Sequence, residues 1–128
     1  MLMTKSYSTM ALQPIPKAWL KQVASVLRSG TSREIQRTGD FSQRLQHDFP
    51  SAFESRVLSE FLRFLESARP HGCPVTMDYP AGETWEFWFT LEKKRTYGKI
   101  LLRTDKKRIL LLSAHLPQKD WLRCEEQN

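Results

Sequence analysis

The period of the apolar residues changes at Gly72, and this change limits the possible folds more than any other feature of the sequence. Before Gly72, apolar side chains recur at three- and four-residue spacing, as on one helix face. After it, they alternate with polar ones, as along strands. The chain therefore predicts an α+β domain, with N-terminal helices packed on one face of a four-stranded antiparallel meander sheet. The expected parts are a flexible arm (1–15), a helical part (17–69), the sheet (74–117) and a tail (118–128), together forming one domain over residues 1–128.

The first helix signal follows two prolines. Pro14 and Pro16 introduce a helix at Lys17–Arg28, and Ser29-Gly30 ends it. The next segment, SGTSREIQRTGDF, is polar and basic. We expect it to be a loop, with at most one short helical turn.

The strongest helix signal begins at Ser51. Upstream of it, Asp40 is suited to cap a short helix that ends near Phe49-Pro50. Ser51 and Glu54 then have the spacing of a capping box, in which both side chains bond to backbone N–H groups. The helix that follows is expected to run to about Ala68. Its apolar stripe consists of Phe53, Val57, Phe61, Phe64, Leu65 and Ala68.

Four strands are expected after Gly72, joined by the short links PAGE, EKKR and DKK. Links this short permit only antiparallel neighbours. The expected strands are Pro74–Tyr79, Trp85–Leu91, Thr96–Thr104 and Arg108–Leu116.

The register of the two hairpins follows from keeping charged residues on one face. A two-residue loop at Lys93-Lys94 sets Trp88 opposite Lys99. A three-residue loop at Asp105–Lys107 sets Lys99 opposite Ser113. It also sets Tyr97 opposite His115 and Leu102 opposite Leu110.

This register divides the sheet into an apolar face and a chemically rich face. The apolar face, expected to pack on the long helix, carries Phe87, Phe89, Ile100, Leu102, Leu110, Leu112 and Leu116. The other carries Glu86, Trp88, Thr90, Tyr97, Lys99, Arg103, Ser113 and His115, with Leu101 and Leu111 among them. A solvent-facing sheet ordinarily carries scattered Lys, Glu and Thr, so this gathering on three adjacent strands indicates a site.

The residue types on that face suit RNA cleavage by internal phosphoryl transfer. His115 is the natural acid or base, because its pKa lies near neutrality. Lys99 and Arg103 could neutralise the extra negative charge on the phosphate, and Glu86 could be the second acid or base. The remaining residues would contact substrate: Trp88 and Tyr97 by stacking on an unpaired base, Ser113 by hydrogen bonding, and Thr90 at the same face. The scheme requires no metal or cofactor.

Structural interpretations compete with this one. His115 could be an ordinary strand-end residue, Lys99 and Arg103 solvated charges, and Glu86 a cross-strand ion-pair partner. Trp88 and Tyr97 could simply pack. Two other functions stay open: a non-catalytic basic module that binds RNA or an acidic protein, and an adaptor with an apolar interface at Trp19, Trp88 and Trp121.

Composition narrows the partners and the compartment. Twenty Lys and Arg against fourteen Asp and Glu give a net charge of +6, which favours polyanions such as nucleic acid. No apolar run reaches the roughly 20 residues that span a bilayer, and the N-terminus is a poor signal peptide. We therefore expect a cytoplasmic protein with no membrane partner. Cys73 and Cys124 are interpreted as structural or incidental thiols, since they lack metal-site spacing.

The order of elements resembles the superfamily of small ribonucleases that includes barnase, EndoU-type nucleases, RNA-cleaving colicins and RelE/ParE-like toxins. The similar segment is Trp85-Glu-Phe-Trp-Phe-Thr…Tyr97-Gly-Lys-Ile-Leu-Leu-Arg103…Ile109-Leu-Leu-Leu-Ser-Ala-His115, within a match that covers roughly residues 50–117. The resemblance implies a toxin that acts on RNA, free or on the ribosome, and is neutralised by a cognate antitoxin or immunity protein. It supports roles for Tyr97, Lys99, Arg103 and His115, and less so for Glu86. ParE-like relatives act on gyrase instead, so the fold alone does not determine the activity.

Overall fold

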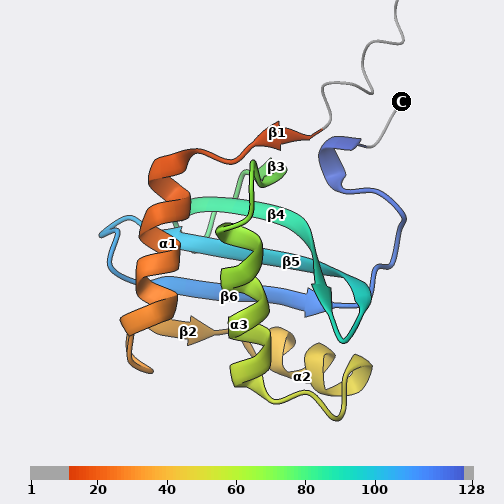
Figure 1. Cartoon of the computed structure of the whole chain (residues 1–128). Helices are drawn as coiled ribbons and strands as arrows, with labels where there is room; N and C mark the ends of the chain where they lie inside the picture. The colour runs from red at the N-terminus through yellow and green to blue at the C-terminus, as the bar shows by residue number, and fades with distance from the viewer. Residues whose placement is uncertain (1–11, 126–128) are drawn as a thin grey trace, which may run out of the picture.

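A computed structural model of the chain describes residues 12–125. Within them, three α-helices pack with one six-stranded mixed sheet, so the α+β class is confirmed (Figure 1). The strand order is β1-β3-β4-β5-β6-β2. The strands are β1 (Gln13–Pro14), β2 (Ile35–Arg37), β3 (His71–Val75), β4 (Gly82–Leu91), β5 (Lys94–Arg103) and β6 (Ile109–His115). No helix among the described residues is long and apolar enough to cross a membrane.

The prediction of a purely antiparallel four-stranded sheet was wrong at both edges. The expected meander is present as β3–β6, but β1 adds to β3 antiparallel and β2 adds to β6 parallel. β1 lies in the predicted arm, whose residues 1–11 fall outside the described part of the chain, and β2 lies in the predicted loop. Strands of two and three residues are too short to show an alternating pattern.

The helices are α1 (Lys17–Ser29), α2 (Gly39–Asp48) and α3 (Glu54–Leu65). In Figure 1, α1 and α3 lie side by side across one face of the sheet, while α2 lies by the edge formed by β6 and β2. The core between helices and sheet is aromatic. The Phe61 and Phe89 ring centroids are 4.6 Å apart, and Phe64 stacks on Phe87 at 4.5 Å.

Two predicted helix caps were wrong. Thr38, not Asp40, caps α2, because its hydroxyl accepts a hydrogen bond from the Phe41 amide at 3.0 Å. The Ser51 capping box does not form, since α3 begins only at Glu54 and has no side-chain cap. Asp40 is therefore the second residue of α2, in its first turn, and its side chain lines a hollow on the sheet.

Strand β3 corresponds to the predicted strand Pro74–Tyr79, but it begins at His71 and ends at Val75. Its pairing with β4 sets Cys73 opposite Glu86. Gly72 permits the close packing there, because a Cβ at that position would lie 2.4 Å from the Glu86 carbonyl oxygen.

The first hairpin turns one residue earlier than predicted, at Glu92-Lys93. Both residues have positive φ, 51° and 66°, which is the geometry of a type I′ turn. As a result Trp88 pairs with Tyr97, and Glu86 pairs with Lys99. A shift of two in the register preserves the faces, so the predicted site face survives.

The second hairpin has the predicted pairing of Tyr97 with His115 and of Lys99 with Ser113. A bulge between Lys99 and Ile100 then changes the register, so that Leu102 pairs with Ile109 instead of Leu110. The predicted faces of β6 were therefore wrong beyond the bulge. Ile109 and Leu111 join the core under the helices, whereas Leu110 and Leu112 do not.

Candidate functional site

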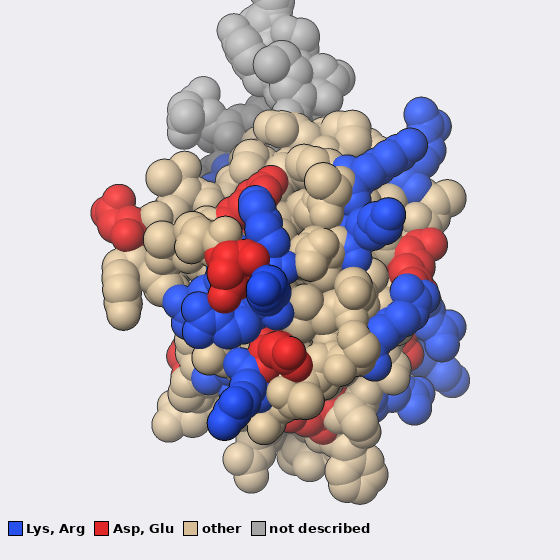
Figure 2. All heavy atoms as spheres, turned by 90° about the vertical axis from the view of Figure 1, so that its left-hand side faces the viewer, with Lys and Arg blue, Asp and Glu red and all other residues tan. Residues whose placement is uncertain are grey.

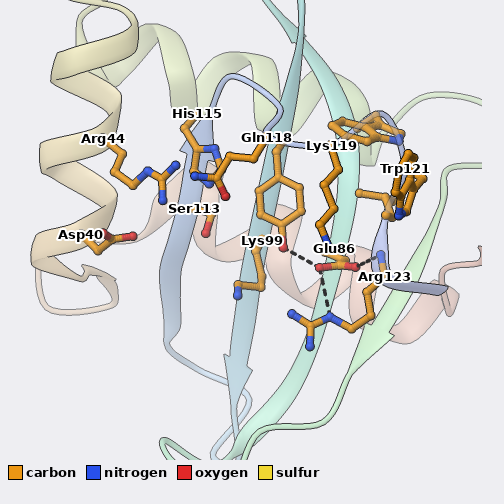
Figure 3. A pocket seen from close by; sticks show the side chains of 13 residues that line it. Asp40, Arg44, Glu86, Lys99, Ser113, His115, Gln118, Lys119, Trp121 and Arg123 are labelled. Atoms are coloured by element: carbon orange, nitrogen blue, oxygen red, sulfur yellow. Dashed lines mark hydrogen bonds and ion pairs between the residues drawn. The ribbon is translucent and has the colours of Figure 1, made fainter. Parts of the chain in front are cut away.

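A hollow of about 490 Å³ opens on the face of the sheet that α1 and α3 leave uncovered (Figure 3). Strands β4, β5 and β6 form its floor. Asp40 and Arg44 reach it from α2 on one side, and the segment after β6 closes it on the other. The lining residues are Asp40, Arg44, Glu86, Trp88, Tyr97, Lys99, Ser113, His115, Gln118, Lys119, Trp121, Leu122 and Arg123.

Glu86 is the most deeply buried charged group of the site, with 1% of its surface exposed. The Tyr97 hydroxyl donates a hydrogen bond to its Oε1 at 2.5 Å, and the Arg123 amide donates to its Oε2 at 2.8 Å. The Arg123 guanidinium lies 3.7 Å from Oε1. These donors compensate the buried carboxylate, so Glu86 positions its neighbours and does not face the open hollow as a free base.

Tyr97 is held as a hydrogen-bond donor. Burial, reinforced by its bond to Glu86 and by that group's negative charge, raises the pKa of Tyr97 well above its usual value. Its hydroxyl therefore stays protonated throughout the neutral range. The ring centroid of Tyr97 lies 5.0 Å from that of His115 and 6.1 Å from that of Trp88, which places it in the middle of the site.

Lys99 is a half-buried lysine beside this pair. Burial lowers its pKa, and the positive charge of Arg123 lowers it further, while Glu86 and Asp40 act in the opposite direction. A lysine of lowered pKa gives up a proton more readily than an exposed one.

His115 ends β6 and is only 6% exposed. Its Nδ1 lies 2.8 Å from the Leu116 carbonyl oxygen, which can only accept, so Nδ1 carries the proton and Nε2 is the nitrogen that can take one. Burial lowers the pKa of His115, and Arg44 adds to this, against the effects of that backbone bond, Asp48 and Asp40. The imidazole is therefore neutral at neutral pH, as a general base must be.

The end of β6 is anchored to α2. The Leu116 amide donates a hydrogen bond to Oδ2 of Asp48 at 2.9 Å. This bond fixes the backbone that holds the His115 ring. Asp48 has a lowered pKa, mainly because His47 bonds to its carboxylate, so it remains an acceptor at neutral pH.

An aromatic rim lies beside the polar centre. Trp88 is half-buried, and the Arg95 guanidinium carbon lies 4.0 Å from its ring centroid. Trp121 is 45% exposed and lines the same hollow. Aromatic faces beside cationic groups suit the stacking of unpaired bases.

The structure brings together six of the eight predicted site residues: Glu86, Trp88, Tyr97, Lys99, Ser113 and His115. Arg103 is excluded, because four residues along a strand move it about 13 Å from Lys99. Its Nη2 instead donates to Oε1 of Gln36 at 3.0 Å. Thr90 is exposed and lines a separate depression beside α3.

Several lining residues were missed by the sequence analysis: Asp40, Arg44, Gln118, Lys119, Trp121 and Arg123. Asp40 and Arg44 are spaced i, i+4 and so share one helix face, which was the one signal available. The tail QKDWLRCEEQN shows no periodic pattern, and nothing in it predicts a return to the sheet.

The interpretation of the two cysteines as thiols was also wrong. Cys73 in β3 and Cys124 form a disulfide across 51 residues of sequence. Cys124 lies in a short 3₁₀ helix, η2 (Arg123–Glu125), so the bond fastens η2 to β3. Two isolated cysteines at such a distance carry no spacing signal for pairing.

The charge in the hollow favours an anion. Four cations (Arg44, Lys99, Lys119 and Arg123) face two carboxylates (Asp40 and Glu86). On another side of the molecule, Figure 2 shows lysine and arginine side chains in separate groups with acidic ones beside them, not one continuous basic stripe. Among residues 12–125, no three His, Cys, Asp or Glu side chains are grouped to hold a metal ion.

Comparisons with protein-family models, curated proteins and solved structures find no match to this chain.

Proposed function

We propose that the protein is a metal-independent endoribonuclease of the toxin type, which cleaves RNA through attack by the ribose 2′-hydroxyl. One observation carries the proposal: a neutral histidine with Nε2 as its proton acceptor and a half-buried lysine line the same cationic hollow. An acid, a base and positive charge around one phosphate are what this reaction needs.

In the proposed reaction, His115 Nε2 takes the proton of the 2′-hydroxyl as its oxygen bonds to phosphorus. The bond from phosphorus to the 5′-oxygen breaks, and Lys99 donates a proton to that leaving oxygen. The products are a 2′,3′-cyclic phosphate and a 5′-hydroxyl. Arg44 and Lys119, which line the hollow, stabilise the negative charge that develops on the phosphate oxygens.

Glu86 has a different role from the one expected from the sequence. Its burial and its bonds to Tyr97 and Arg123 make it a positioning residue, which aims the Tyr97 ring between His115 and Trp88. Trp88 with Arg95 would stack an unpaired base, so single-stranded RNA is the favoured substrate.

The partners follow from this activity. The substrate is RNA, free or on the ribosome, and the site of action is the cytoplasm. A cognate antitoxin or immunity protein would neutralise the toxin, and an acidic surface would suit the cations of the hollow.

The direct test uses a single-stranded RNA oligonucleotide and a matched 2′-deoxy oligonucleotide in excess EDTA. Wild-type protein should cut the RNA to 2′,3′-cyclic phosphate ends and leave the 2′-deoxy strand intact. His115→Ala should lower the rate at least about 100-fold. Thr90→Ala, outside the hollow, should cut like wild type. Equal cutting of the 2′-deoxy strand would overturn the mechanism.

A second candidate is a non-catalytic RNA-binding module, and the engagement of both Glu86 oxygens favours it, because this carboxylate is then not available as an acid or a base. This candidate predicts binding that weakens with salt and persists in the His115→Ala protein, without cleavage of any RNA.

A further inference from the structure

The Cys73–Cys124 disulfide lies directly beside the buried carboxylate of the site. Cys73 is the cross-strand partner of Glu86. Cys124 follows Arg123, whose amide and guanidinium both contact Glu86, as the dashed lines in Figure 3 show. A covalent bond thus adjoins the residue that compensates the Glu86 charge.

The same short segment also holds Trp88. Oε1 of Glu125 accepts hydrogen bonds from Trp88 Nε1 at 3.4 Å and from the Leu122 amide at 2.7 Å. Residues 122–125, which we name the clasp, therefore bind two alternate residues of β4. Both of these, Glu86 and Trp88, line the hollow.

One contact of the clasp, the Arg123–Glu86 ion pair, is near solvent, whereas the Leu122 side chain is buried. The Arg123 side chain is 61% exposed, so water screens its charge and weakens its attraction to the buried Glu86 carboxylate. The disulfide links the clasp to β3 by a covalent bond, which exposure to water does not weaken. Cys73 is fully buried and Cys124 half-buried, so Cys124 is the sulfur that a reductant reaches first.

We infer that the Cys73–Cys124 disulfide is a redox switch that keeps the site assembled while oxidised, an inference that rests on the proposed function for its activity readout. The reductant is a dithiol. One of its thiolates attacks the Cys124 sulfur, which forms a mixed disulfide and releases the Cys73 thiolate to take up a proton. The second thiol then displaces Cys124, so the protein disulfide gains two electrons and two protons and the dithiol becomes a disulfide.

Release of the clasp removes two donors from Glu86 and one acceptor from Trp88. A buried carboxylate that lacks donors is unfavourable, so the Glu86–Tyr97 array rearranges or takes in water. The reduced site is less ordered and cleaves RNA more slowly. Cytosolic thiol systems reduce disulfides, so the oxidised protein would lose its activity progressively in the cytoplasm, its proposed site of action, and its active lifetime there would be limited.

The test compares the oxidised full-length protein with the same protein treated with dithiothreitol. The whole sequence contains two cysteines, so a thiol assay should rise from zero to two, and the dithiol has no other disulfide to act on within the chain. Hydrogen exchange of the Arg123 amide should accelerate at least about tenfold on reduction, because its hydrogen bond opens locally. RNA cleavage at low substrate should fall by about tenfold. The Cys73→Ser/Cys124→Ser protein should match the reduced one and ignore the dithiol.

Three outcomes would overturn the inference. In the first, two thiols appear in a folded protein while the Arg123 exchange rate is unchanged. In the second, the clasp opens but cleavage stays the same or rises. In the third, circular dichroism shows that reduction unfolds the whole chain, which makes the disulfide a stability element only. If the oxidised protein does not cut RNA, the proposed function fails, and the exchange rate still decides whether the clasp responds to reduction.

Discussion

The hydroxyl of Tyr97 and the carboxylate of Glu86 share a 2.5 Å hydrogen bond between adjacent strands, and the carboxylate is 1% exposed. Both side chains come from the face of the sheet that the helices leave uncovered. Their bond places a protonated phenol between the His115 imidazole and the Trp88 indole.

Replacement of this phenol tests how strongly the pair stabilises the fold. Tyr97→Phe leaves Glu86 buried with one donor fewer, and should lower the free energy of unfolding by about 1–3 kcal/mol. Urea unfolding at neutral pH measures the change. Tyr79→Phe is the matched control, because Tyr79 is 88% exposed. Equal stability of the two variants would contradict the role assigned to the bond.

The Tyr97 phenol should also resist ionisation. In the unfolded chain a tyrosine titrates near pH 10, whereas the folded pKa of Tyr97 is raised, mainly by burial. The stability that this shift contributes is therefore complete below about pH 10 and is lost as the pH rises further. Absorbance of tyrosinate should show a phenol that titrates well above pH 10, and this late step should be absent from Tyr97→Phe.

Acid should destabilise the fold through His115. Its folded pKa is lowered from 6.5, chiefly by burial, so below about pH 6.5 the unfolded chain binds a proton that the folded one does not. The free energy of unfolding should fall as the pH is lowered from 6.5 to 5. In His115→Asn, which keeps a donor for the Leu116 carbonyl, this fall should be shallower. Asp48 titrates at a lower pH and does not interfere in this window.

Loss of the disulfide should lower overall stability. It closes a long loop, because its ends are 51 positions apart in the sequence, and removal of such a bond typically costs about 2–4 kcal/mol. Urea unfolding of Cys73→Ser/Cys124→Ser against the oxidised wild type measures this change. A difference below about 1 kcal/mol would show that the clasp is held mainly by its other contacts.

The face of the sheet that carries the site could be predicted from the sequence because alternation along a strand is local. Trp88, Tyr97 and Lys99 share a face in any register that keeps the core apolar. The partner of each residue was harder to predict. The first hairpin turns at Glu92 and Lys93, which have positive φ, one residue earlier than predicted. The bulge between Lys99 and Ile100 shifts the register of β6, so that Leu111 lies in the core where Leu110 was predicted.

The walls of the site could not be predicted, because they depend on contacts between distant segments. Arg123 contacts Glu86 across 37 residues, and Gln36 binds Arg103 across 67. The second contact holds the Arg103 side chain at the far end of β5, which strand spacing already places outside the site. The first contact depends on where η2 packs against the sheet, and the second depends on where β2 joins it. No periodic pattern in the sequence predicts either position.

The most direct measurement of the central claim is a cleavage assay on mixed cellular RNA in excess EDTA, with and without ribosomes. Wild type, His115→Ala, Lys99→Ala and the control Thr90→Ala should be compared as oxidised proteins whose folding is confirmed by circular dichroism. Wild type and Thr90→Ala should cut RNA, while His115→Ala and Lys99→Ala should lose at least about 100-fold in rate. Absence of cutting by folded wild type, or full activity in folded His115→Ala, would contradict the assignment of this site as a ribonuclease centre.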